Sequence, residues 1–342
     1  MATACELRRS RRGRPWRRCV ERDLLLMASS SGTVVGRLAP SPTGVLHLGN
    51  ARTFLLAWLS VRSLSGTLLL RIEDIDGPRV KAGAMEQAIE DLRWLGLDWQ
   101  GEVFVQSTRH MLYRAATQRL VDLGLAYPCV CTRKEVDEAA SAPHAHPGGA
   151  GGDGPIYPGT CRGRFVSIED AKLQTGREAA LRFRVDASEV PFKDGFRGPQ
   201  DGAIAGDFVI QKRDGGPAYQ LAVVVDDAAQ SVSEVLRADD LLPSTPRQLL
   251  LYRALGLPEP KFVHVPLLVG GDGLRLAKRH GDTSLRYFRE QGVSAGDLVG
   301  YLAKLCGLRD SQSACTPQDL LAQFDLSKLS ASPMRGDDHK LL

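Results

Sequence analysis

Hydrophobic positions near the start of the chain alternate between short apolar runs and a helical spacing. Residues 34–38 form an apolar run that predicts a buried strand, and residues 40–44 are rich in turn formers. From residue 48 to 65 apolar side chains recur at helical spacing, and residues 67–72 form the next apolar run. Strand, helix and strand in this order predict a βαβ unit, whose parallel strands bind ligands at their carboxyl ends.

The rest of the chain continues the mixture of helical and strand patterns. Helices are predicted at residues 80–95, 108–123 and 245–255, and strands at residues 183–185, 208–211 and 262–268. Residues 142–155 hold five glycines and three prolines, which predicts a flexible loop. The chain after Gly273 is helical and polar in pattern. These patterns predict an α/β protein.

Composition and charge narrow the class of protein. The chain is 43% hydrophobic and 25% charged, which is typical of a soluble globular protein. No apolar run approaches the roughly 18 residues of a membrane span, so no membrane partner is expected. The net charge of +4 comes from the first 31 residues, which hold eight arginines and three acidic residues. Any RNA contact of the remaining, nearly neutral chain must therefore come from local patches.

Three interpretations compete for the arginine-rich residues 1–32. They could form a basic arm for RNA, a transit peptide, or sequence translated from upstream of the true start. The three acidic residues argue against a transit peptide. A disordered leader, or one that precedes the true start, is the favoured prediction.

The first strand-to-helix turn carries candidate phosphate chemistry. Residues 37–50 read R-L-A-P-S-P-T-G-V-L-H-L-G-N and lead into the predicted helix. A helix start attracts phosphate, and His47 there can hydrogen-bond a phosphate oxygen as charge develops on it. Gly49 lacks the side chain that would block a flat base. A pattern of four residues is common, however, and a surface turn with a solvent-facing histidine is the better explanation when the motif stands alone.

A second motif changes this balance. Residues 273–279 read G-L-R-L-A-K-R, a basic loop beside a glycine that could fold over a triphosphate. Alone it would be a solvated basic loop. Together, the two motifs at opposite ends of an α/β domain describe the nucleotide site of a class I aminoacyl-tRNA synthetase.

The chain resembles the glutamyl-tRNA synthetases over residues 34–288. Residues 37–50 match that family's signature region, and residues 70–76, 207–209, 218–227 and 236–248 resemble its later blocks in the same order. The resemblance implies a class I Rossmann-type parallel sheet with an inserted α/β subdomain that bears zinc and a short helical C-terminal stub. It implies a catalytic domain at residues 33–285, an insertion at about 78–205 and a helical region at 286–342.

The resemblance also implies a site for each substrate. For glutamate it implies Arg37, Leu38, Ala39, Pro40, Ser41, Glu73, Tyr219 and Arg237. For ATP it implies His47, Gly49, Asn50, Arg275 and Lys278, of which His47 and Lys278 would be catalytic. The chemistry agrees, because arginine binds carboxylate, an acid such as Glu73 can pair with the substrate ammonium, and a tyrosine hydroxyl can orient a ligand.

The implied reaction is attack of the glutamate α-carboxylate on the α-phosphate of ATP, with Mg²⁺ on the departing phosphates. A nucleic-acid hydroxyl would then accept the glutamyl group. The ATP loop departs from the family's Lys-x-Ser-Lys pattern, since Arg275 replaces the first lysine and Ala277 the serine. Arg275 keeps the charge and Lys278 keeps the key position, so activity is still expected.

Three cysteines suggest a metal site. Cys129, Cys131 and Cys161 could bind Zn²⁺ if a fourth ligand is found, and three reduced core cysteines are the alternative. A short branch of the same family, the glutamyl-queuosine tRNA(Asp) synthetases, carries Cys-x-Cys and Tyr-x-x-x-Cys as zinc ligands. That resemblance implies Tyr157 as the fourth ligand, with His144 and His146 as rivals.

The acceptor is predicted from the same branch. Only 63 residues follow Arg279, too few for the long anticodon-binding region of a full glutamyl-tRNA synthetase. We therefore expect a monomeric cytoplasmic enzyme with ATP, L-glutamate and tRNA(Asp) bearing queuosine as its partners. A truncated ordinary glutamyl-tRNA synthetase that charges tRNA(Glu) and an inactive RNA-binding paralogue are the alternatives. Activation of glutamine is less favoured, because it would leave a guanidinium poorly paired.

Overall fold

A computed structural model describes residues 32–140, 156–204, 206–270 and 283–335 of the 342-residue chain. The strands are β1 (Val35–Leu38), β2 (Thr67–Ile72), β3 (Phe104–Val105), β4 (Ala126–Cys129), β5 (Ala180–Phe183), β6 (Phe192–Asp194), β7 (Gly198–Gln200), β8 (Phe208–Gln211), β9 (Glu234–Ala238), β10 (Lys261–Val265), β11 (Leu268–Val269) and β12 (Met334–Arg335). The helices are α2 (Leu48–Ser63), α3 (Ala84–Trp94), α4 (His110–Asp122), α5 (Arg133–Ala140), α6 (Ile168–Thr175), α7 (Tyr219–Ala229), α8 (Thr245–Leu255), α9 (Leu285–Glu290) and α10 (Ala295–Leu305).

Parallel strands form the centre of the molecule. β1, β2 and β3 are hydrogen-bonded in that order, and β9 pairs with β10. The two groups meet where the backbone N–H of Ser233 donates to the carbonyl oxygen of Val35 at 2.9 Å. The junction of β1 with β9 is thus the point at which the strand order changes direction, and ligands of open α/β sheets bind outside the carboxyl ends of the strands at such points.

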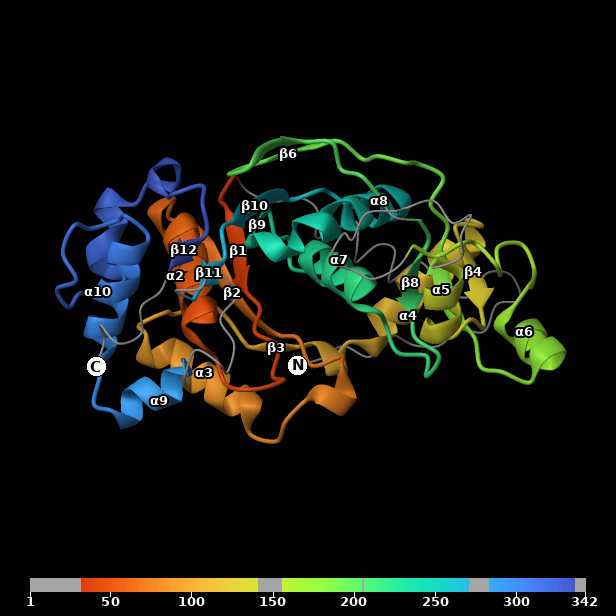
Figure 1. The fold of residues 1–342 in the computed structure, drawn as a ribbon, viewed down its shortest axis with the longest axis horizontal. Helices are drawn as coiled ribbons and strands as arrows, with labels where there is room; N and C mark the ends of the chain where they lie inside the picture. The colour runs from red at the N-terminus through yellow and green to blue at the C-terminus, as the bar shows by residue number, and fades with distance from the viewer. Residues whose placement is uncertain (1–31, 141–155, 205, 271–282, 336–342) are drawn as a thin grey trace, which may run out of the picture.

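Helices cover both faces of this sheet and enclose two hydrophobic cores (Figure 1). On one side α2 packs on β1, β2 and β9, and the apolar faces of α3, α9 and α10 join it in the first core. On the other side α4, α7 and α8 pack together over the second core. Every apolar residue of α2 from Leu55 to Leu59 is buried, which explains why its sequence pattern is nearly continuous.

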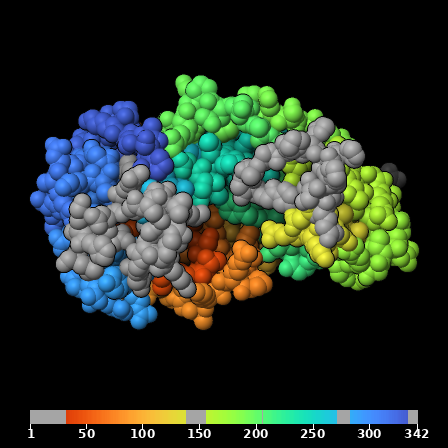
Figure 2. Space-filling model, in the orientation of Figure 1, coloured from red at the N-terminus to blue at the C-terminus, as the bar shows by residue number. Residues whose placement is uncertain are grey.

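A smaller subdomain lies beyond α4 and α7. β4, β5 and β8 form its antiparallel sheet, and α5 and α6 lie at the end of the molecule farthest from α10 (Figure 1). Its own core contains Tyr127, Phe165 and the buried members of the cysteine cluster. In the space-filling view the N-terminal strand and helix region occupies the middle, between the C-terminal helices and this subdomain (Figure 2). The hairpin of β6 and β7 projects back over β10 (Figure 1).

Most predicted elements are confirmed, with changes that have physical causes. The predicted strand at residues 262–268 is two strands, β10 and β11. Pro266 lies between them and has no N–H to continue the hydrogen bonding of a strand. The strand predicted at 183–185 is β5, three residues earlier at its start. The helix predicted from residue 80 begins at Ala84, after a short 3₁₀ helix at Gly77–Arg79. The predicted insertion range of about 78–205 includes α3 and β3. In the structure α3 packs in the first core, and β3 pairs with β2.

Several predictions concern residues that the structure does not describe. The arginine-rich residues 1–31, the glycine-rich loop with His144 and His146, and the basic loop with Arg275 and Lys278 lie outside the described residues. Within the described parts, no helix combines the length and the apolar character needed to cross a membrane.

Candidate active site

A cavity of about 490 Å³ lies at the carboxyl ends of the central strands. Its walls come from the segments that follow β1 and β2, the start of α2, the first residue of α7 and the end of β9. Ten of the residues predicted to bind glutamate or ATP line it: Arg37, Ala39, Pro40, Ser41, His47, Gly49, Asn50, Glu73, Tyr219 and Arg237. Residues far apart in the sequence therefore meet at the strand junction, where the fold predicts a ligand.

One further predicted residue lies elsewhere, and two others belong to a segment that the structure does not describe. Leu38 is fully buried in the first core and does not line the cavity, because alternate residues of a strand point to opposite faces. Arg275 and Lys278 lie outside the described residues, but the segments on either side of them lie beside the cavity. Leu268 lines it, and Ser284 forms an isolated bridge with His47.

The start of α2 is arranged around His47. His47 is the residue before the first helical turn, and its backbone N–H donates to Asn50 Oδ1 at 3.1 Å. A Cβ atom on Gly49 would lie 3.1 Å from His47 Cε1, tighter than ordinary van der Waals contact. Glycine at this position therefore leaves room for the imidazole as well as for a ligand. The first N–H groups of α2 have no partner within the helix and lie at the positive end of its dipole. This end of the helix favours anions.

Two buried arginines contribute positive charge to the same cavity. Arg37 lies 3.4 Å from Asp227 through Nε and donates from Nη1 to the carbonyl oxygen of Leu236 at 3.3 Å. Arg237 uses Nε and Nη2 for contacts with the protein. Its Nη1 is buried and has no hydrogen-bond partner among the residues that the structure describes. Burial lowers the pKa of Arg237, and the nearby charge of Arg37 adds to this effect.

Glu73 supplies the negative charge of the cavity. It is buried, and Arg71 Nη2 donates to its Oε1 at 3.2 Å. Burial raises the pKa of Glu73, while Arg71 and Arg37 act in the opposite direction. A substrate ammonium at this carboxylate would favour its ionised form.

Arg71 is a structural residue that sequence reasoning missed. It is fully buried, and its Nη1 donates to Asp227 Oδ1 and Gln230 Oε1, both at 2.7 Å. Burial alone would lower its pKa, but the charges of Asp227 and Glu73 outweigh burial and raise it. Its place in an apolar strand, two residues before Glu73, was the available signal.

The three predicted cysteine ligands form one cluster with Tyr157. The sulfur atoms of Cys129, Cys131 and Cys161 all lie within 4.8 Å of one another. Tyr157 Oη lies 3.4 Å from Cys129 Sγ and 3.6 Å from Cys131 Sγ, and the Sγ atoms of Cys131 and Cys161 are 3.5 Å apart. The backbone N–H of Cys161 donates to Tyr157 Oη at 2.8 Å.

These distances fit a tetrahedral zinc site. With Zn–S bonds of about 2.3 Å, tetrahedral sulfur ligands lie about 3.8 Å apart, close to the spacing of this cluster. Burial raises the pKa of the Cys131 thiol to about 12, so this thiol needs a metal or another cation to ionise at neutral pH. Arg182 donates from Nε to Cys129 Sγ at 3.2 Å and lies over the Tyr157 ring, 3.8 Å from its centroid. Three sulfurs and one phenol oxygen could thus hold one Zn²⁺.

Comparison with known proteins agrees with this geometry. Residues 33–342 match the family described as tRNA synthetases class I (E and Q), catalytic domain. A glutamyl-Q tRNA(Asp) synthetase of Symbiobacterium thermophilum is 50% identical over 310 residues, which cover 88% of this chain and 95% of that protein. A glutamyl-Q tRNA(Asp) synthetase of Rhodopirellula baltica is 47% identical over 327 residues, covering 90% and 97%.

A solved structure has the same fold. The glutamate-tRNA synthetase of Elizabethkingia anophelis superposes with a TM-score of 0.76 at 28% sequence identity, over 90% of this chain and 69% of that one. The parallel sheet, the cavity at its strand junction and these similarities agree. The chain belongs to the class I tRNA synthetases of the glutamate and glutamine group.

Proposed function

We propose that this protein activates L-glutamate with ATP and transfers it to the queuosine base of tRNA(Asp). The observation that supports glutamate activation best is the cavity that combines two buried guanidinium groups, Arg37 and Arg237, with the carboxylate of Glu73. This charge pattern complements a ligand with two carboxylates and one ammonium. Relatives named glutamyl-Q tRNA(Asp) synthetase, at 47–50% identity over most of the chain, support the acceptor.

Each side chain has a role in the first step. Glu73 would pair with the ammonium, Arg37 and Arg237 with carboxylate, and Tyr219 would orient the ligand from the start of α7. The α-carboxylate oxygen then attacks the α-phosphorus of ATP, and the bond to the β-phosphate breaks to release pyrophosphate. ATP enters with Mg²⁺ on its phosphates. His47 at the start of α2, and Lys278 from the basic loop, would stabilise the charge that develops on phosphate.

The same pocket favours glutamate over glutamine. Arg237 Nη1 is a buried cationic donor without a protein partner among the described residues. A carboxylate would satisfy and neutralise it. An amide of the same shape would leave part of that charge uncompensated in a buried site, which costs binding free energy.

A second groove next to this cavity has the charge expected for RNA. It measures about 980 Å³, shares Tyr219 with the first cavity, and extends to Cys129 and Cys131. Its basic lining residues are Arg79, Arg133, Arg182, Lys212, Arg213 and Arg247, and its acidic ones are Asp207 and Asp214. This excess of positive charge is typical of a surface that binds the phosphates of a nucleic acid.

The cysteine cluster forms part of the wall of this groove. Arg213 Nη2 donates to the carbonyl oxygens of Val130 and Cys131, both at 2.8 Å. We propose that Zn²⁺ held by Cys129, Cys131, Tyr157 and Cys161 fixes this turn, and with it the position of Arg213 in the groove. The role of the metal would be structural, because all four ligand positions are then filled by protein.

Transfer of labelled glutamate tests the function directly. Purified tRNA(Asp) with queuosine, tRNA(Asp) without it, and tRNA(Glu) are incubated with enzyme, ATP and labelled glutamate. We expect label only on tRNA(Asp) that carries queuosine, and we expect it to survive removal of the terminal adenosine.

Two other outcomes would favour the alternatives. Label on the terminal ribose of tRNA(Glu) would identify an ordinary glutamyl-tRNA synthetase. Failure of glutamate-dependent ATP–pyrophosphate exchange would instead support an inactive RNA-binding paralogue.

A further inference from the structure

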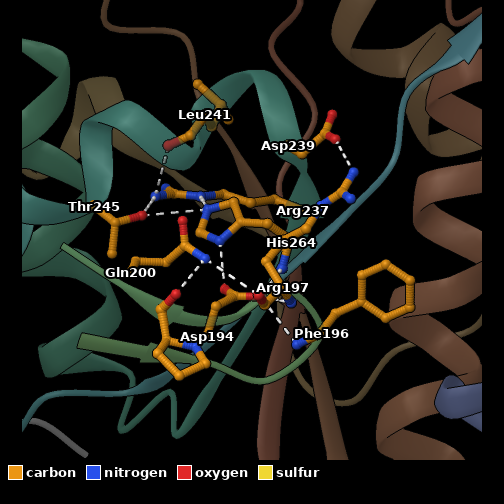
Figure 3. Close-up of polar contacts among 10 residues, drawn as sticks. Asp194, Phe196, Arg197, Gln200, Arg237, Asp239, Leu241, Thr245 and His264 are labelled. Atoms are coloured by element: carbon orange, nitrogen blue, oxygen red, sulfur yellow. Dashed lines mark hydrogen bonds and ion pairs between the residues drawn. The ribbon is translucent and has the colours of Figure 1, made fainter. Parts of the chain in front are cut away.

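Hydrogen bonds connect buried side chains from the hairpin of β6 and β7 to Arg237, which lines the glutamate cavity (Figure 3). Asp194 Oδ2 lies 2.6 Å from His264 Nδ1, and Arg237 Nε donates to His264 Nε2 at 2.9 Å. Asp194 and His264 are almost completely buried, and neither lines the cavity. His264 and Arg237 are opposite each other in the parallel ladder of β10 and β9.

The hydrogen bonds define which nitrogen of His264 carries the proton. A guanidinium nitrogen can only donate, so Nε2 of His264 must accept from Arg237 and carries no hydrogen. Nδ1 therefore carries the proton, and this N–H donates a hydrogen bond to Asp194 Oδ2. Thr245 Oγ1 lies 3.3 Å from Nε2 and accepts from Arg237 Nη2 at 3.0 Å, so its hydroxyl can donate to the same acceptor. Burial lowers the pKa of His264, in agreement with a neutral ring.

Asp194 is held in turn by the backbone. Its Oδ1 accepts from the N–H groups of Phe196 at 2.9 Å and Arg197 at 2.8 Å, and from that of His264 at 3.2 Å. These bonds leave Oδ2 to face the imidazole. The carboxylate thus fixes both the position and the protonation of the ring.

This arrangement orients Arg237 without neutralising it. Nε is used by His264, and Nη2 donates to Thr245 Oγ1 and to the carbonyl oxygen of Leu241 at 3.3 Å. No described residue accepts a hydrogen bond from Nη1, so this nitrogen is left for a ligand. A direct ion pair with Asp194 would offset the charge of Arg237, whereas a neutral imidazole between them fixes the plane of the guanidinium and leaves its charge for the substrate.

We infer that Asp194 and His264 are positioning residues of the glutamate site, which hold Arg237 so that Nη1 meets a substrate carboxylate. The inference rests on the proposed activation of glutamate and does not depend on the RNA acceptor. It assigns a role to two buried residues that lie outside the sequence motifs described above.

The variant Asp194→Asn tests the inference with little change of shape. Its Oδ1 can keep the three backbone bonds, but an NH₂ group then faces His264 Nδ1. The ring must respond by moving its proton to Nε2, where it opposes the N–H of Arg237. In ATP–pyrophosphate exchange we expect KM for glutamate to rise about tenfold or more, with KM for ATP and kcat changed less than about threefold.

Further variants separate positioning from a merely structural role. His264→Gln can place its carbonyl oxygen toward Arg237, so its KM for glutamate should lie closer to the wild-type value than that of His264→Leu. Asp91→Asn is the matched control, since Asp91 is equally buried but bonds to Gln87 of α3 and Arg289 of α9. Its KM for glutamate should be unchanged, whatever it does to stability.

The outcomes are distinguishable from failure of the proposed function. A folded Asp194→Asn protein with wild-type KM for glutamate, beside an active wild-type enzyme, would overturn the inference alone. A wild-type enzyme that neither binds glutamate in calorimetry nor activates it would overturn both.

Discussion

At the scale of single residues, the cavity holds two guanidinium groups that repel each other. Burial and the charge of Arg37 both lower the pKa of Arg237, so the free protein holds a cation under unfavourable conditions. An anionic ligand relieves this cost, which links binding to charge neutralisation. The geometry of Arg237 matters as much as its charge, because Nε and Nη2 are committed to the protein.

Replacement of Arg237 by lysine separates charge from geometry. Lysine keeps the positive charge but lacks the planar fork of arginine. It cannot donate to His264 and Thr245 in the geometry of Arg237 and at the same time present a further donor to the ligand. We expect KM for glutamate to rise by about one to two orders of magnitude, as measured by pyrophosphate exchange. Arg286→Lys is the control, since Arg286 is exposed and pairs with Glu290. Equal KM values for both variants would contradict this role for Arg237.

His264 gives the folded protein a dependence on pH. Burial lowers its pKa in the folded state, while the unfolded chain keeps about 6.5. As pH falls below about 6.5 the unfolded chain binds a proton that the folded chain does not, so the free energy of unfolding decreases until pH reaches the folded pKa. Urea midpoints at pH 7.5 and 5.5 should differ more for the wild type than for His264→Gln. An equal shift in both proteins would refute the assignment.

Residues differ in how far the sequence reveals them. Arg37, Glu73, Tyr219 and Arg237 stand in motifs, and the structure brings all four to one cavity. His264 stands in the apolar strand FVHVP, where a buried histidine has no distinctive pattern. Its partner Asp194 is 70 positions away, and only tertiary structure brings the two together.

At the scale of elements, the sequence predicts a helix well where a helical pattern of apolar residues extends over many positions. It predicts less where packing against neighbouring elements determines the secondary structure. The helix predicted at residues 245–255 coincides with α8. The apolar run at residues 222–225 does not by itself indicate helix or strand, because a helix that is buried on most sides loses its polar stripe. The structure places that run in α7, between α4, α8 and the second core.

The start of α2 tests the role of Gly49. A Cβ atom there would press on the His47 ring, with 3.1 Å to Cε1 and 3.2 Å to Nδ1. Gly49→Ala should therefore displace His47 and reduce kcat/KM for ATP by about tenfold or more. Gly77→Ala is the control, because nothing lies within 4 Å of a Cβ atom at that position. The prediction fails if both variants exchange pyrophosphate as fast as the wild type.

At the scale of the molecule, the described residues form three hydrophobic cores of unequal size. The first two combine the central sheet with its helices, whereas the third contains few residues and includes Tyr157, Cys129 and Cys161. Such a small core buries little apolar surface, and a metal that links two segments would add what it lacks. Sequence indicated the cluster through spacing, but only the fold shows that Tyr157 lies against its sulfurs.

Metal content tests this view of the third core. Wild-type protein should contain about one Zn²⁺ per chain, and Cys161→Ser should contain much less and melt at a lower temperature. Cys315→Ser is the control, since Cys315 is a buried cysteine of the first core. Tyr157→Phe should bind zinc more weakly than wild type. Wild-type zinc content in both the Cys161 and Tyr157 variants would rule out this ligand set.

The parallel pairing of the central strands has a consequence for how the protein folds. α2 lies between β1 and β2 along the chain, and α8 lies between β9 and β10, so each parallel pair needs its crossover connection to close. Contacts across long loops form slowly, whereas helices appear early. The cavity takes residues from both strand pairs and exists only when both crossovers have closed. During refolding, recovery of glutamate binding should therefore lag behind the recovery of helical circular dichroism.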